Sequence, residues 1–238
     1  MKKHKVGILA AALALGLSAS PALAAIELWD WAFNVDGTMT RGLDDFGDPT
    51  GDSMPTSGAL NPEGLGTLTW TTSGDGNHTF LAFFDYEINE DGDTFFNEYG
   101  AVNNESALKT GQSWEIDDPW FGDIYGHVVD GTGLDNDNGA VDGDVSFAMG
   151  WDFTLLADET ATITLKLFEF ALDAAGAANT PTGFFLSHMD YDNDRVIYFT
   201  SSLDIGGGNP VPEPATMLLF GTGLAGLYGA RRRRMKKA

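Results

Sequence analysis

The chain has 238 residues, no cysteine and a formal net charge of −22, with 13 basic and 35 acidic residues. Residues 25–208 hold 34 of these acids but only four basic residues, so this part alone has a net charge of −30. Such a charge excludes a protein that binds nucleic acid, because that function needs many cations to replace the counterions of the phosphates. The lack of cysteine excludes disulfides, so folding must depend on the apolar core.

The N-terminus has the three parts of a secretory signal peptide. Residues 1–5 are basic, residues 6–17 are apolar, and Ala22 and Ala24 form the pair of small residues before a cleavage point. The apolar run is too short to span a membrane as a helix. We therefore predict export by the general secretion machinery and removal of residues 1–24 by signal peptidase.

Residues 25–205 contain runs in which apolar and polar residues alternate, which is the pattern of strands with one buried face. In the first run, Trp29, Trp31, Phe33 and Val35 share a face. Clusters of Asp, Asn, Gly and Pro separate the runs, as turns require, and no segment shows a sustained helical period. The pattern predicts an all-β fold, a single antiparallel β-sandwich-like domain. Its strands are expected over residues 27–35, 66–72, 79–88 (a central strand), 145–156, 160–167, 183–189 and 195–203.

One acidic segment fits a twelve-residue calcium-binding loop at most positions. The predicted ligands of Ca²⁺ are Glu87, Asn89, Asp91, Asp93 and Glu98. Glu87 departs from the usual aspartate at the first place, and both flanks have the pattern of strands instead of helices. The alternative interpretation is a solvated hairpin loop with Asp-Gly at its tip.

The sequence carries no signature of a catalytic site. Two further acidic segments, residues 135–144 and 190–194, lack the spacing of a calcium loop and favour turns. There is no G-x-S-x-G, no phosphate-binding glycine loop and no H-E-x-x-H, and His78, His127 and His188 lie far apart along the chain. We predict a protein that is not an enzyme. A glycosidase needs only two well-placed carboxylates, so a polysaccharide hydrolase stays an alternative.

The C-terminus changes character after residue 205. Residues 206–210 form a glycine-rich linker, and Pro212, Glu213 and Pro214 follow within a stiff, proline-rich stretch. Residues 215–230 are uncharged and mostly apolar. As a helix they reach about 24 Å, and flanking residues can extend this toward the ~30 Å hydrocarbon core of a membrane. The basic residues that end the chain favour a cytoplasmic location for this terminus.

The order of these features resembles the PEP-CTERM sorting signal of Gram-negative bacteria, here residues 211–238. The resemblance implies that an exosortase-type membrane protease recognises Pro212, Glu213 and Pro214 and removes the tail. It implies a precursor in the inner membrane with a cytoplasmic C-terminus. The mature protein would be secreted or held at the cell surface or in the extracellular matrix, in association with exopolysaccharide. An anchor that is never cleaved is the alternative.

These observations predict a non-enzymatic exported surface or matrix protein that associates with exopolysaccharide. The alternative function is a calcium-assisted carbohydrate-binding module, in which exposed aromatic rings stack on sugar rings. Trp114 and Trp120 are the candidate aromatics for such stacking, and packing in the core is the alternative role for both.

Overall fold

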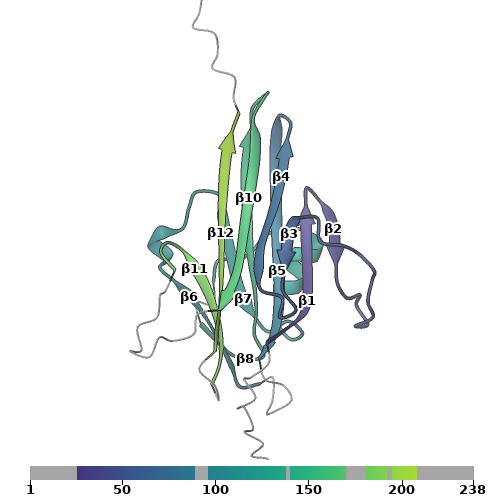
Figure 1. Ribbon diagram of the computed structural model, residues 1–238, viewed down its shortest axis with the longest axis vertical. Coiled ribbons are helices and arrows are strands. Elements are labelled where there is room, and N and C mark those ends of the chain that lie inside the picture. The colour runs from purple at the N-terminus through teal and green to yellow at the C-terminus, as the bar shows by residue number, and fades with distance from the viewer. Residues whose placement is uncertain (1–25, 89–95, 138–139, 170–180, 192–194, 208–238) are drawn as a thin grey trace, which may run out of the picture.

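The computed structural model describes residues 26–88, 96–137, 140–169, 181–191 and 195–207. In this part of the chain two antiparallel sheets pack face to face (Figure 1). The five-stranded sheet has the order β2-β1-β5-β9-β7, and the seven-stranded sheet has the order β3-β4-β10-β12-β11-β6-β8. The expected all-β sandwich is therefore confirmed.

The five-stranded sheet consists of β1 (Ile26–Val35), β2 (Thr38–Arg41), β5 (Gly76–Ile88), β7 (Gln112–Asp117) and β9 (Ser146–Leu155). The seven-stranded sheet consists of β3 (Ser57–Leu60), β4 (Gly66–Ser73), β6 (Glu98–Asn103), β8 (Ala140–Gly143), β10 (Thr160–Glu169), β11 (Phe185–Asp190) and β12 (Val196–Gly206). A short 3-10 helix, η1 (Glu105–Ala107), and one α-helix, α1 (Ile124–Asp130), complete the described elements.

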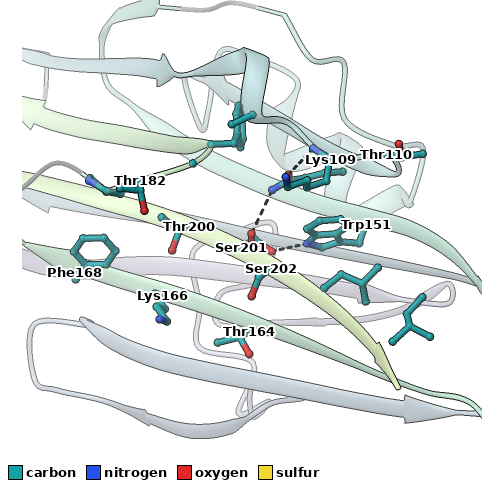
Figure 2. A pocket seen from close by; sticks show the side chains of 17 residues that line it. Lys109, Thr110, Trp151, Thr164, Lys166, Phe168, Thr182, Thr200, Ser201 and Ser202 are labelled. Carbon is teal, nitrogen blue, oxygen red and sulfur yellow. Dashed lines mark hydrogen bonds between the residues drawn. The ribbon is translucent and has the colours of Figure 1, made fainter. Parts of the chain in front are cut away.

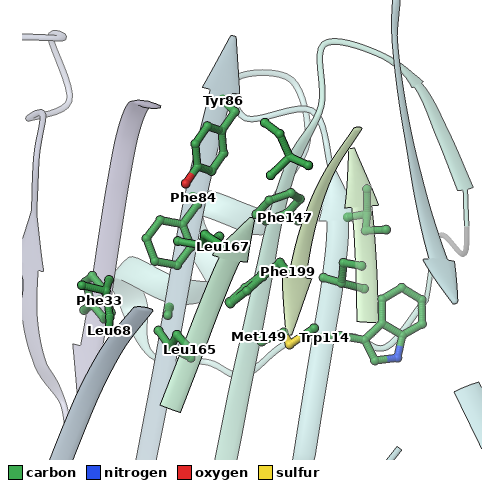
Figure 3. Packing of buried hydrophobic residues seen from close by; sticks show 14 of the residues in the cluster. Phe33, Leu68, Phe84, Tyr86, Trp114, Phe147, Met149, Leu165, Leu167 and Phe199 are labelled. Carbon is green, nitrogen blue, oxygen red and sulfur yellow. The ribbon is translucent and has the colours of Figure 1, made fainter. Parts of the chain in front are cut away.

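The core lies between the two sheets and is rich in aromatic rings (Figure 3). Phe84 of β5 and Phe199 of β12 meet across the interface with ring centroids 5.3 Å apart, in an edge-to-face arrangement. Phe147 of β9 contacts the same Phe199 ring at 5.2 Å. Edge-to-face and offset pairs are the favoured arrangements of aromatic rings, so the period-2 aromatic runs join the sheets.

All seven strands predicted from the sequence are present, and β5 is central as expected, between β1 and β9. The expectation that Trp29 shares a face with Trp31 and Phe33 is wrong. The register between β1 and β5 shifts between Leu28 and Asp30, and this β-bulge leaves Trp29 51% exposed. A bulge inserts one residue into the alternation and so reverses the face of the side chain at that point.

Helix α1 was not predicted from the sequence, and it covers part of the outer face of the five-stranded sheet. Its Ile124 and Val128 are buried against Ala32, Leu81 and Phe83. The signal was present in the sequence, since two apolar residues four apart precede Gly131, which caps the helix in the left-handed conformation with φ 66°. A helix of one or two turns is too short to show a sustained period.

No helix among the described residues is long and apolar enough to cross a membrane. The predicted signal peptide with Ala22 and Ala24, and the predicted tail with Pro212, Glu213 and Pro214, lie outside the described residues.

Candidate functional site

Three carboxylates gather on the outer face of the five-stranded sheet, beyond the area that α1 covers. Asp85 and Glu87 lie two residues apart on β5, so strand alternation directs both to the outer face. Asp85 pairs with Ser146 of β9, which brings Asp144, two residues before Ser146, beside them. One carboxylate oxygen of each of Asp85, Glu87 and Asp144 lies within 4.8 Å of the others.

Two of the three carboxylates are buried, and Glu87 is half-buried. Asp85 is 2% exposed and Asp144 5% exposed. Within the described part of the chain, Asp85 Oδ1 is buried and accepts no hydrogen bond. Burial raises the pKa of Asp85 well above its usual range, and the negative charges of Glu87 and Asp144 raise it further. A buried carboxylate without donors costs several kcal/mol when ionised, so the site favours either a proton or a cation.

An aromatic groove opens over this carboxylate cluster. The groove has a volume of about 720 Å³ and is lined by Glu27, Trp29, Glu87, Phe96, Trp120, Phe121 and Asp144. Trp29 is 51% exposed, Trp120 59% and Phe121 86%, which is unusual for residues of this size. Exposed aromatic rings that surround polar side chains in a groove are typical of ligand-binding sites, whereas aromatic rings in a core are buried.

Local backbone chemistry presents the rings of Trp120 and Phe121. The Asp118 carboxylate accepts hydrogen bonds from the backbone N–H groups of Trp120 and Phe121, each at 2.8 Å, and so fixes the turn that carries both. Packing in the core is confirmed for Trp114, which is 3% exposed, whereas Trp120 lies in the groove.

A small cavity of about 50 Å³ lies beside the groove, and Asp30, Asp85 and Trp120 are among its lining residues. The Asp30 carboxylate accepts hydrogen bonds from the N–H groups of Trp31 and Leu43. Burial raises the pKa of Asp30 to about 6, although these hydrogen bonds and Arg41 lower it. Asp30 therefore adds a second titrating carboxylate next to Asp85.

A separate pair, Glu115 and His127, fastens α1 to the sheet. His127 Nδ1 lies 2.9 Å from Glu115 Oε2, and the backbone N–H of Asp135 also donates to Glu115. Burial raises the pKa of Glu115, and the hydrogen bond with Glu115 raises the pKa of His127. Glu115, His127 and Asp135 have the composition of a metal site. The contacts of Glu115 with His127 and with the backbone N–H of Asp135 explain this group as a structural anchor for α1.

The two ends of the predicted calcium loop have different surroundings in the structure. Glu87 belongs to the carboxylate cluster. Glu98 is buried in β6, where its Oε2 accepts a hydrogen bond from Val145 N–H and lies 2.9 Å from His188 Nε2. Asn89, Asp91 and Asp93 lie outside the described residues, so calcium binding by the loop stays a prediction. Sequence reasoning missed Asp85 and Asp144, because strand pairing brings them together.

Comparison with known protein families matches residues 210–234, which include Pro212, Glu213 and Pro214, to the PEP-CTERM protein-sorting motif. The chain carries a PEP-CTERM sorting motif. The motif implies processing by an exosortase, a membrane-anchored precursor and sorting to the cell surface. Comparisons with curated proteins and with solved structures found no match. The PEP-CTERM motif thus gives the destination, and the domain must be interpreted from its own residues.

Proposed function

We propose that the protein is a non-catalytic surface or extracellular-matrix protein that binds exopolysaccharide with the help of calcium, at the groove over Asp85, Glu87 and Asp144. The observation that carries this proposal is the buried carboxylate of Asp85, which lacks a hydrogen-bond donor at Oδ1 among the described residues and lies beside two further acids. Sorting to the cell surface supports the proposal, because the groove then faces the medium in which extracellular polysaccharide is found.

Calcium fits this cluster better than other common metals. Ca²⁺ takes six to eight oxygen ligands in a flexible arrangement, and extracellular sites bind it at about 10⁻⁴–10⁻³ M. The cluster offers carboxylate oxygens alone, whereas zinc prefers nitrogen and sulfur ligands. The predicted ligands Asn89, Asp91 and Asp93 lie outside the described residues, so the proposed site is defined by Asp85, Glu87 and Asp144.

The rings around the cluster suit a sugar. The faces of Trp29 and Trp120 offer apolar surface on which the C–H side of a pyranose ring can stack, while a bound cation can hold its hydroxyl oxygens. A cation that neutralises Asp85, Glu87 and Asp144 also makes the groove accessible to a polysaccharide that carries negative charge.

A polysaccharide hydrolase is the second candidate. The observation that favours it is the raised pKa of Asp85 next to other carboxylates, which is the arrangement of an acid and a nucleophile in glycosidases. Against it, Asp85 is almost completely buried and is not among the residues that line the aromatic groove. A general acid must reach the oxygen of the scissile bond.

The test is affinity electrophoresis of the protein through gels that contain extracted exopolysaccharide, with calcium and then with chelator. We expect calcium to increase the retardation of the protein, and we expect Asp85→Asn and Trp120→Ala each to abolish that increase. Equal mobility with calcium and with chelator would contradict the proposal. Release of reducing ends from the same polysaccharide, lost in Asp85→Asn, would establish the hydrolase instead.

A further inference from the structure

A second groove of about 730 Å³ lies beside β12 of the seven-stranded sheet, and it shares no lining residue with the carboxylate cluster (Figure 2). It follows β12 beyond Phe199, with Thr200 and Ser202 on the outer face and Trp151 and Leu203 on the core side, and it reaches the segment between η1 and β7. Its lining residues are Ala107, Lys109, Thr110, Gln112, Trp151, Thr164, Lys166, Phe168, Pro181, Thr182, Gly183, Phe184, Thr200, Ser201, Ser202, Leu203 and Ile205.

The charge of this groove is opposite to that of the domain. Residues 25–208 contain only four basic residues, and two of them, Lys109 and Lys166, line this groove. None of its lining residues is acidic, although the same part of the chain holds 34 acids. The other two basic residues are paired, Arg41 with Asp45 and Arg195 with Glu169. Within the described residues, neither lysine forms an ion pair with a carboxylate.

The groove exists because β12 is longer than its neighbour β11. Strand β11 pairs with β12 only from Val196 to Phe199. Beyond Phe199, β12 pairs with β10 alone among the described strands, and the Ser201 carbonyl accepts a hydrogen bond from the Gln112 side chain. Trp151 Nε1 donates a hydrogen bond of 2.6 Å to Ser201 Oγ, which fixes this part of β12 against the core (Figure 2).

Hydroxyl groups and one aromatic ring line the space between the lysines. Thr200 and Ser202 on β12 lie between Lys166 and Lys109, and Thr164 lies beside Lys166 on β10, where it pairs with Ser202 (Figure 2). Phe168 stacks on Tyr198 with ring centroids 5.8 Å apart and forms the apolar end of the groove. The groove therefore offers two cations, a row of hydroxyls and a ring face.

We propose that this groove binds a carboxylated saccharide chain of the uronate type. Each lysine would pair with a sugar carboxylate, the hydroxyls of Thr164, Thr200 and Ser202 would bond to ring hydroxyls, and Phe168 would stack on a sugar ring. This proposal rests on the proposed function, because it assigns a negative charge to the polysaccharide that the protein binds. Binding in the lysine groove needs neither calcium nor the carboxylate cluster.

The test measures binding of a hexameric oligogalacturonate to the full-length protein in detergent, with chelator present so that only the lysine groove acts. About 0.15 M salt is used, because it shortens the Debye length to about 8 Å and screens the repulsion between the acidic domain and the probe. We expect Lys109→Gln with Lys166→Gln to weaken binding about tenfold or more, as the loss of two charge-assisted contacts implies. The wild-type protein should bind the carboxyl-reduced hexamer no more tightly than the double variant binds the oligogalacturonate.

Two matched controls keep this test specific. Lys236→Gln with Lys237→Gln removes the same charge from the C-terminal tail and should leave affinity unchanged. Thr164→Val should weaken binding, whereas Thr162→Val, two residues along β10 and not among the lining residues, should not. An unchanged melting temperature shows that each variant is folded.

Equal binding by wild type and the Lys109/Lys166 variant would overturn the proposal, as would equal affinity for the carboxyl-reduced hexamer. Tighter binding of dextran sulfate than of oligogalacturonate would overturn the assignment to carboxylates. A change of oligomeric state in the double variant, without a change in saccharide binding, would show that an acidic part of a second copy occupies the groove. If the double variant still shows calcium-dependent retardation by exopolysaccharide, the proposed function holds whether or not the lysine groove binds saccharide.

Discussion

Asp85 and Asp144 bring carboxylate oxygens within 4.8 Å of each other although neither residue is more than 5% exposed. Two like charges at this separation in a buried site destabilise the folded state unless a proton or a cation neutralises one of them. The stability of this domain is therefore expected to depend on both pH and divalent cations.

Without divalent cations, the free energy of unfolding should fall as the pH rises from about 5 to 8. Burial raises the pKa of Asp30 to about 6 and that of Asp85 well above its usual range, so each carboxyl binds a proton more readily in the folded state. Below the usual carboxyl pKa both states are protonated, and stability is lost as the pH rises through the folded pKa values.

Two histidines also make the folded state less stable as the pH rises. Hydrogen bonds with Glu115 and Asp36 raise the pKa values of His127 and His78, so their stabilisation is complete below the unfolded pKa of histidine and is lost as the pH rises through the folded values. Urea unfolding in chelator at several pH values should show a loss of about 1–3 kcal/mol over this range. A free energy of unfolding that stays constant or rises over this pH range would show that burial does not raise the pKa values of Asp85 and Asp30.

Asp85→Asn should stabilise the protein in chelator at pH 8 and remove its response to calcium. The amide has the shape of the carboxylate without its charge, so the cost of burying that charge disappears together with a ligand oxygen for the metal. Calorimetric melting and calcium titration measure the two effects. The matched control is Asp158→Asn, which removes a charge from an exposed turn at φ 70°, a conformation that asparagine tolerates. A calcium response in Asp85→Asn equal to that of the control would exclude Asp85 as a ligand.

His127→Ala should destabilise the domain by about 1–3 kcal/mol, because it leaves the buried Glu115 without its main partner. Loss of this contact leaves α1 held to the five-stranded sheet by its apolar packing through Ile124 and Val128. Urea unfolding measures the change, and hydrogen exchange locates it in residues 124–130. The control is Gly126→Ala on the same helix, where an added Cβ meets no atom within 4 Å. If both variants unfold at the same urea concentration, the pair does not anchor α1.

The strands and the fold class could be predicted from the sequence because period-2 alternation is a local property of the chain. Trp29 was misplaced because a single-residue bulge has no local signature in an otherwise regular run. The carboxylate cluster was predicted only at Glu87, since its other members, Asp85 and Asp144, meet through the pairing of β5 with β9. The sequence also did not indicate that Lys109 and Lys166 share a groove, because they come from segments that lie 57 positions apart in the chain and that the tertiary fold brings together.

The two ends of the chain should be absent from the mature protein. We expect intact-mass analysis of protein recovered from the cell envelope and the medium to show the loss of residues 1–24 and of everything beyond the Pro-Glu-Pro region. The PEP-CTERM match over residues 210–234 supports the second loss. Replacing Glu213 by Ala should make the full tail persist. A mature species that still carries Arg231–Arg234 would contradict cleavage by an exosortase.

The most direct test of the account is the melting temperature of the protein in chelator and in millimolar calcium at pH 8. Calcium at about 10 mM is about 10–100 times the dissociation constant of about 10⁻⁴–10⁻³ M of an extracellular site, so it stabilises the folded state by about 1.4–2.7 kcal/mol. For a domain of this size, this corresponds to an increase of about 3–10 °C. We predict an increase in this range with calcium. Identical melting temperatures in the two solutions would contradict the cation site at Asp85, Glu87 and Asp144.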